Sequence, residues 1–205
     1  MAYYPLVSRD GFCPITMIKD NGMAFILPGI FSLPQHIDAL NKTPESYRPE
    51  RCPQLSCRHV GIWCHGCYTR KPAGLDPSSH DTVSIPRFYC PECRCTCSAL
   101  PEYIPPRGRY LWEVRQIVFL LLLAGNSINR THASNGSLAT RRTIKRWWRD
   151  FNDSDCFLNF SLHLRLHLPC MGRRDGFSAF WRACLSLRPL STVMRLLHED
   201  GVCVP

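Results

Sequence analysis

Apolar residues in the middle of the chain recur at helical spacing. From Tyr110 onward they follow a three-and-four pattern, and Gly125 supplies a stop. The periodic positions are Leu111, Val114, Ile117, Val118, Leu121 and Leu122. Phe119, Leu120 and Leu123 make the last turns apolar on nearly every side. We therefore expect this helix to be buried in a core.

Two capping residues predict the helices that follow. Ser127 is a suitable cap for a short helix over 128–133, and Thr140 is a suitable cap for a further helix that ends at Phe151. The letters SNGS between them predict a turn or a small insertion.

The last fifty residues show two different periodicities. Leu and Phe alternate strictly with polar residues from 158 to 168, which is the two-residue period of a strand. Farther on, the apolar spacing predicts helices over 177–185 and 193–197, the second between a cap at Ser191 and a stop at Gly201. The pattern alone leaves 157–168 open between strand and helix.

Proline and cysteine divide the first half of the chain. Residues 1–49 hold six prolines and few charges, which predicts an extended arm with one short helix over 35–41, opened by Pro34. Residues 50–106 hold eight of the 13 cysteines, a composition typical of turns and short strands. We expect four segments: a proline-rich N-terminal arm (1–49), a cysteine module (50–106), a helical domain (107–152) and a C-terminal helical region (153–205).

Two cysteine pairs predict a metal site. CPQLSC contains Cys52 and Cys57, and CPEC contains Cys90 and Cys93. Four thiolates on two tight turns complete a tetrahedral zinc shell with no open position, so the site would be structural. The competing ligands are Cys64, His65, Cys67, Cys95 and Cys97. A second zinc ion on these residues stays open.

Charge, hydropathy and cysteine content narrow the possible partners and cellular compartments of the protein. Lys and Arg number 25 against 16 Asp and Glu, for a formal charge of +9, which favours polyanionic partners. The apolar run at 117–124 is too short to cross a bilayer, and the first residues lack the pattern of a secretory signal. These features favour a cytoplasmic protein with no membrane partner, and in a reducing compartment clustered cysteines point to metal rather than to disulfides.

The helix predicted after Thr140 is strongly amphipathic. Its basic positions are Arg141, Arg142, Lys145, Arg146 and Arg149, and its apolar positions are Ile144, Trp147, Trp148 and Phe151. At about 100° per residue the two sets fall on opposite faces. Taken alone, such a helix is more often a solvated surface element. A buried helix, a short helix, a turn and then a capped basic helix is, however, the order of a helix-turn-helix, whose last helix reads double-stranded DNA.

The chain resembles the small transposase-like proteins of bacterial insertion sequences, in which a zinc ribbon precedes a helix-turn-helix. The matching stretches include YRPERCPQ, HGCY, SIPRFYCPEC, LLLAGNSIN, TRRTIKRWWRDF, GFSAFWRACL and LSTVMRLL, from about residue 34 onward. The resemblance implies that Cys52, Cys57, Cys90 and Cys93 are the ligands and that the C-terminal region is helical. This chain departs from the pattern in two places. The spacing of the first cysteine pair is widened to CPQLSC, and His132 and the letters SNGS stand where the pattern has an apolar residue and a tighter turn.

We therefore predict a mainly α fold with a small four-cysteine zinc ribbon, a helix-turn-helix and C-terminal helices. The predicted function is sequence-specific DNA binding, similar to a transposase end-recognition module or a mobile-element regulator. The alternative is a zinc-stabilised interaction or oligomerisation protein that forms a homo-oligomer and does not read DNA. Such a protein could be an inactive remnant of a mobile element. Its contact residues would be Phe177, Phe180, Trp181, Met194 and Leu197. RNA binding through Trp63, Phe88 and Tyr89 is a third hypothesis.

Catalysis finds little support in the sequence. A three-carboxylate transposase core requires acids gathered on a mixed α/β framework around two metal ions. The acids of the last 56 residues are Asp150, Asp153, Asp155, Asp175, Glu199 and Asp200, and we expect them at helix ends. Transposition chemistry would then come from a separate catalytic transposase chain.

Overall fold

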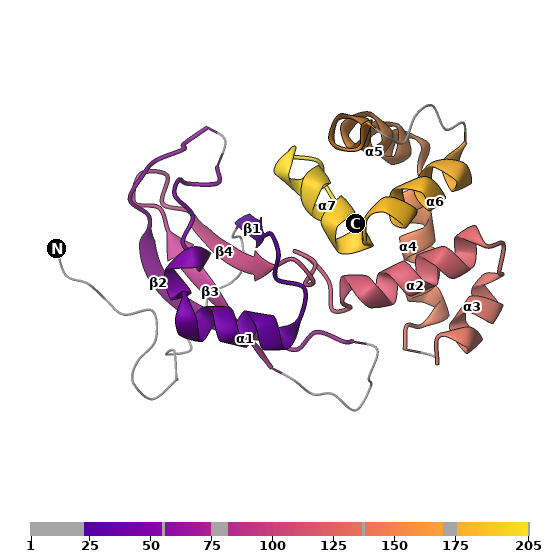
Figure 1. Cartoon of the computed structure of the whole chain (residues 1–205), viewed down its shortest axis with the longest axis horizontal. Coiled ribbons are helices and arrows are strands. Elements are labelled where there is room, and N and C mark those ends of the chain that lie inside the picture. Colours follow the sequence, from indigo (N-terminus) through magenta and orange to yellow (C-terminus); the bar gives the residue numbers. More distant parts are fainter. Residues whose placement is uncertain (1–22, 55, 75–81, 137, 170–175, 205) are drawn as a thin grey trace. The chain divides into compact units, whose positions relative to one another are not determined.

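The computed structural model describes residues 23–54, 56–74, 82–136, 138–169 and 176–204. These residues form two compact units. The N-terminal unit comprises 23–72 and 82–106, and the C-terminal unit comprises 73–74 and 107–204. Figure 1 shows a sheet in the first unit and a group of helices in the second.

The N-terminal unit is built on a mixed sheet of four strands. Its elements are β1 (Met23–Leu27), α1 (Leu33–Lys42), the 3-10 helix η1 (Pro44–Tyr47), β2 (Trp63–Arg70), β3 (Val83–Tyr89) and β4 (Thr96–Pro101). The strand order across the sheet is β1-β4-β3-β2. Strand β3 is antiparallel to both β2 and β4, whereas β1 runs parallel to β4, with Met23 opposite Cys97.

This sheet shows that the prediction of a mainly α fold with only a small ribbon was wrong. The described residues form a mixed fold, in which a four-stranded sheet accompanies the helices. The error arose at 23–27, which we expected in an extended arm and which pairs instead with β4. A five-residue apolar run has no periodicity that identifies it as a strand. The predicted helix over 35–41 is confirmed as α1, and 1–22 lie outside the described residues.

A buried histidine ties α1 to the sheet. The Nδ1 atom of His36 lies 2.6 Å from the hydroxyl of Tyr47, and its Nε2 atom lies 2.7 Å from the backbone oxygen of Ser84 on β3. A carbonyl only accepts, so Nε2 carries the proton and Nδ1 accepts from the hydroxyl. Burial lowers the pKa of His36, although the bond to Ser84 opposes that shift. The neutral ring therefore holds η1 and β3 against α1.

The described part of the C-terminal unit contains six helices. They are α2 (Trp112–Leu123), α3 (Ile128–Ser134), α4 (Arg141–Asn152), α5 (Ser154–His167), α6 (Phe177–Leu187) and α7 (Leu190–Glu199). The helical interpretation of 157–168 is confirmed by α5, against the strand-like alternation. No helix among the described residues has both the length and the apolar content needed to cross a bilayer.

The predicted caps of α3 and α4 are confirmed, and that of α7 is wrong. The hydroxyl of Ser127 accepts from the N–H of Arg130, and the hydroxyl of Thr140 accepts from the N–H of Thr143, both at 3.3 Å. Helix α7 begins one residue before Ser191, whose side chain is buried, and its N-cap residue, Pro189, offers no side-chain cap. The side-chain oxygen of Gln116 on α2 instead accepts from the N–H of Leu190 at 2.7 Å, so a distant residue takes the place of a local cap.

Helix α2 is packed on two sides as predicted, but Ile117 and Leu120, which we expected in the core, are 37% and 40% exposed. One side of α2 packs with α4 through Val114, Val118 and Leu122. The other side places the ring of Phe119 4.3 Å from that of Phe151 on α4, in a stacked contact. Burial on both sides fixes the orientation of α4.

Candidate metal centre and basic helix face

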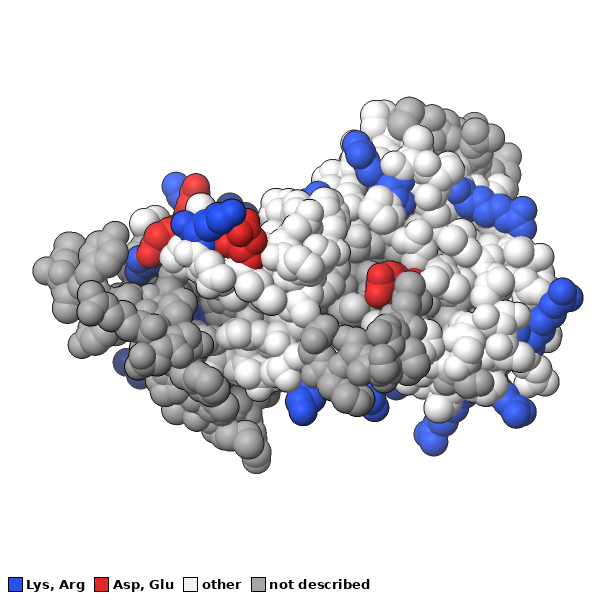
Figure 2. Space-filling model, turned by 60° about the horizontal axis from the view of Figure 1, so that its bottom comes forward, with Lys and Arg blue, Asp and Glu red and all other residues white. Residues whose placement is uncertain are grey.

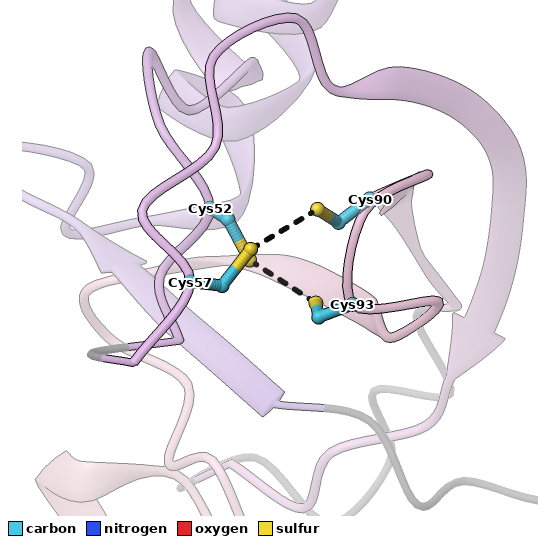
Figure 3. A group of neighbouring side chains, drawn as sticks. All are labelled: Cys52, Cys57, Cys90 and Cys93. Atoms are coloured by element: carbon cyan, nitrogen blue, oxygen red, sulfur yellow. Dashed lines mark hydrogen bonds between the residues drawn. The ribbon is translucent and has the colours of Figure 1, made fainter.

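The four predicted cysteines lie on two loops at one end of the sheet. Cys52 and Cys57 belong to the loop between η1 and β2, and Cys90 and Cys93 belong to the loop between β3 and β4. The first loop is closed by the N–H of Cys52, which donates to the oxygen of His59 at 2.8 Å. The second is closed by the N–H of Cys90, which donates to the oxygen of Cys95 at 2.9 Å. Figure 3 shows the four thiols pointing toward one another.

A left-handed residue follows the second cysteine of each loop. Arg58 has φ of 48° and Arg94 has φ of 59°, and these are the described non-glycine residues with positive φ. Such a conformation reverses the chain directly after the ligand, and it is uncommon for a residue with a Cβ atom. Both loops therefore turn through a left-handed residue directly after their second cysteine, although the loops differ in length. The sequence offered no signal for it, because glycine is absent from both positions.

The sulfur positions fit a tetrahedral metal ion. The Sγ atoms of Cys52 and Cys93 are 3.6 Å apart, those of Cys57 and Cys90 are 3.7 Å apart, and all four lie within 4.8 Å of one another. Ligands placed about 2.3 Å from a central zinc ion at tetrahedral angles would be about 3.8 Å apart. The cluster can therefore hold a metal ion without rearrangement of the loops.

Backbone hydrogen bonds favour the thiolate form of Cys90. Burial by itself raises the pKa of this thiol, but hydrogen bonds from the backbone N–H groups of Cys93 and Glu92 lower the pKa of Cys90 to about 7. Burial raises the pKa of Cys52. Metals bind thiolates, so an incoming ion has to displace protons from this cluster.

The other cysteines of the module take no part in this cluster. Among the described residues, the four cysteines named above form the one group of three or more Cys, His, Asp or Glu ligands that is close enough for a metal ion. Cys64 is half-buried on β2, and Cys95 is exposed. Cys97 is buried in the core, and burial raises its pKa to about 12. A second metal centre on these residues gains no support.

The five predicted basic residues all lie on α4 and are all exposed. They are Arg141, Arg142, Lys145, Arg146 and Arg149. The opposite face is buried through Ile144, Trp147 and Phe151. At about 100° per residue the basic set spans an arc of about 140°. The exposed face of α4 therefore carries cations along its whole length.

Ring contacts hold this helix in place from beneath. The guanidinium of Arg115 on α2 is buried between two rings, 4.7 Å from the centroid of Trp112 and 5.3 Å from that of Trp147. Tyr110 meets Trp147 edge-on, with centroids 5.2 Å apart. These contacts join α4 to α2 on the side away from the basic face.

Basic side chains also project elsewhere on the surface. On the face drawn in Figure 2, Lys and Arg side chains protrude at separate places, some from uncharged surroundings and some beside acidic side chains. Cations are thus spread over this face, and α4 is distinguished by five exposed cations within nine residues.

The acids of the C-terminal unit occupy helix ends or ion pairs. Asp153 accepts from the N–H of Cys156 at 3.1 Å and caps α5, and this hydrogen bond lowers the pKa of Asp153. Glu199 pairs with Arg195 at 2.6 Å. Asp200 accepts from His163 and His167, both at 2.9 Å. The described acids do not gather into a two-metal site, and Asp175 lies outside the described residues.

The residues of the two alternative hypotheses differ in their exposure. Four of the five contact residues expected for oligomerisation are buried in the core of the C-terminal unit: Phe180, Trp181, Met194 and Leu197. On the sheet, Phe88 is buried whereas Trp63 is 58% exposed. The oligomerisation surface expected from the sequence is therefore largely occupied by the fold itself.

No protein family, no characterised protein and no solved structure matches this chain.

Proposed function

We propose that this chain is a zinc-stabilised, sequence-specific DNA-binding protein. In this proposal the Cys52, Cys57, Cys90 and Cys93 cluster binds one structural Zn²⁺, and α4 enters the major groove of double-stranded DNA. The observation that carries the proposal is the exposed basic face of α4 on a helix whose other face is buried.

The donor set supports zinc among the possible metals. Four thiolates at tetrahedral spacing suit Zn²⁺, which is closed and structural when all four positions are protein sulfurs. Two of the ligands, Cys52 and Cys90, belong to the buried core of the N-terminal unit. Binding would therefore stabilise the sheet and the two loops together.

The arrangement of α2, α3 and α4 supports DNA reading. Helix α3 ends at Ser134 and α4 begins at Arg141, after a turn, and α2 packs against both. This is the order of a helix-turn-helix, in which the N-terminal residues of the last helix contact base edges. Arg142 and Lys145 lie in the first turns and are our candidates for base contacts, whereas Arg149, near the end, is our candidate for a phosphate contact. Within the part of the chain that the structure describes, Arg149 also has an acidic neighbour, Asp150, at 3.3 Å.

The resemblance to transposase-like proteins supports a role at the ends of a mobile element. In that role the chain would recognise DNA and a separate catalytic transposase chain would cut it. The described acids lie at helix ends and in ion pairs, which supports recognition rather than catalysis.

Selection of bound duplexes from random DNA with the zinc-loaded protein tests the proposal. Once a preferred site is known, Arg142→Ala should cost about 1 to 3 kcal/mol of binding free energy on that site and relax the preference at one base position. Arg149→Ala should weaken binding to all duplexes alike and lower the slope of log K against log salt by about one unit.

A matched control is Arg188→Ala, which removes an exposed arginine at the end of α6. It should lower affinity by less than either α4 variant. If the selection yields no preferred duplex, and the Arg142 and Arg149 variants bind like the parent, α4 is a solvated surface helix and the proposal is wrong.

A further inference from the structure

Helix α5 has two apolar rows on opposite sides. The alternation of Leu and Phe with polar residues from 158 to 168 would put all apolar residues on one face of a strand. On a helix, residues four apart form a row, so the same alternation produces two rows. One row consists of Phe160, Leu164 and Leu168, and the other consists of Leu158, Leu162 and Leu166.

Among the described residues, only the first row has a partner within the unit. Phe160, Leu164 and Leu168 are buried in the core with Trp181 and its neighbours on α6 and α7. The second row, which we call the leucine ridge, is 59%, 58% and 78% exposed at Leu158, Leu162 and Leu166 respectively. Single exposed leucines are ordinary, but three consecutive members of one helical row form a continuous apolar surface.

The charges along α5 indicate what covers this ridge. Asp155 lies in the first turn of the helix and Arg165 in its last turn, and both are exposed. Phe160 lies midway between Leu158 and Leu162 and also midway between Asp155 and Arg165. An antiparallel copy of α5, with its two-fold axis at this level, would set Leu158 against Leu162 and the acidic end against the basic end, and would bring Leu166 to the first turn of the other copy. The opposed helix dipoles add to this attraction.

We propose that the leucine ridge of α5 is the interface of a homodimer, in which two copies of α5 pack antiparallel. A ridge of residues spaced by four takes part in both common classes of helix packing, and in the class with a crossing angle of about 20° the two helices lie side by side along their length. The inference does not rest on DNA binding by α4. Four of the five residues expected at an interface from the sequence are buried in the core, whereas those of the ridge remain accessible.

Molecular mass in solution tests the proposal without DNA. Sedimentation and light scattering of the full chain should give twice the chain mass at the upper end of a range from about 1 to about 100 µM. The double variant Leu158→Gln with Leu162→Gln should raise the dissociation constant at least tenfold. Its melting temperature should stay close to the parent's, because both side chains are mostly exposed in the unit.

Leu187→Gln is the matched control, since Leu187 is a 43% exposed leucine on α6. It should leave the dimer unchanged. A parent chain that stays monomeric over the whole range would overturn the proposal, and so would a dimer that survives the double variant. A monomer whose ridge binds lipid vesicles instead would overturn it as well.

Charge reversal tests the antiparallel arrangement. Asp155→Lys and Arg165→Glu should each weaken self-association, because each sets like charges against each other at both ends of the pair. An equimolar mixture of the two variants should recover the dimer, since in the mixed pair each end again meets an opposite charge. If the mixture is no more associated than the separate variants, α5 does not pair in this way.

Discussion

Replacement of one cluster cysteine should remove both the metal ion and the fold of the N-terminal unit. In Cys93→Ser the thiolate that lies 3.6 Å from the Sγ atom of Cys52 becomes a neutral hydroxyl. The ion would then have three thiolates and one poor ligand, and its affinity should fall steeply. Because Cys52 and Cys90 are part of the buried core, loss of the ion also leaves two unpaired thiols inside the unit.

The size of the effect follows from linkage between binding and folding. Structural zinc sites in small domains bind with an apparent free energy of about 10 to 16 kcal/mol at neutral pH, and this binding free energy contributes to the free energy of unfolding. A small domain is stable by only about 5 to 15 kcal/mol in total. We therefore expect Cys93→Ser, or chelation of the parent, to abolish most of the stability of the N-terminal unit and to leave the helices of the C-terminal unit folded.

Elemental analysis and hydrogen exchange measure the two parts of this prediction. The parent should retain one zinc ion per chain, and Cys93→Ser none. Amides of β3 and β4 should lose protection in Cys93→Ser, while those of α2 should keep it. Cys64→Ser is the control, because Cys64 is a half-buried cysteine outside the cluster. Equal loss of zinc from Cys64→Ser, or unchanged protection of β3 after chelation, would refute the assignment of ligands and their role in folding.

Three further predictions concern the loops, the protons and the basic helix. Arg94→Gly should retain zinc and fold, because glycine adopts positive φ freely, whereas Arg94→Val should lower the melting temperature. Equal melting temperatures of the two variants would contradict a left-handed residue at this position. Zinc affinity, measured by competition with a chromophoric chelator, should fall from pH 8 to pH 6. The pKa of Cys90 is about 7 and the pKa of Cys52 is raised, so protons compete with zinc for the thiolates as the pH falls. An affinity that is constant over this range would argue against thiolate ligands. Trp147→Ala should cost about 3 to 5 kcal/mol of stability in the C-terminal unit, because the ring is buried against Arg115. The loss should be measured as a lower melting temperature. A loss of DNA binding with an unchanged melting temperature would instead place Trp147 on the DNA.

Local sequence was sufficient for the features that depend on neighbouring residues. The caps Ser127 and Thr140 act within one helical turn, so their letters predict the starts of α3 and α4 directly. The division of α4 into a basic and a buried face follows from the 3.6-residue period alone. The spacing within CPEC likewise indicated a pair of metal ligands, although the local sequence does not show which loop carries the other two ligands.

Tertiary structure decided the features that depend on distant residues. The strand at 23–27 exists because β4 lies beside it, and no local pattern in five apolar residues reveals that pairing. The alternating leucines of α5 suit a strand by their period, but Phe160, Leu164 and Leu168 gain a common core only when the segment is helical. The sequence therefore determined which residues carry charge, caps and sulfur ligands, and only the packed chain decided the sheet, the closure of the cysteine cluster and which leucines stay outside. The physical reason is that contacts between distant segments select among local conformations of similar energy.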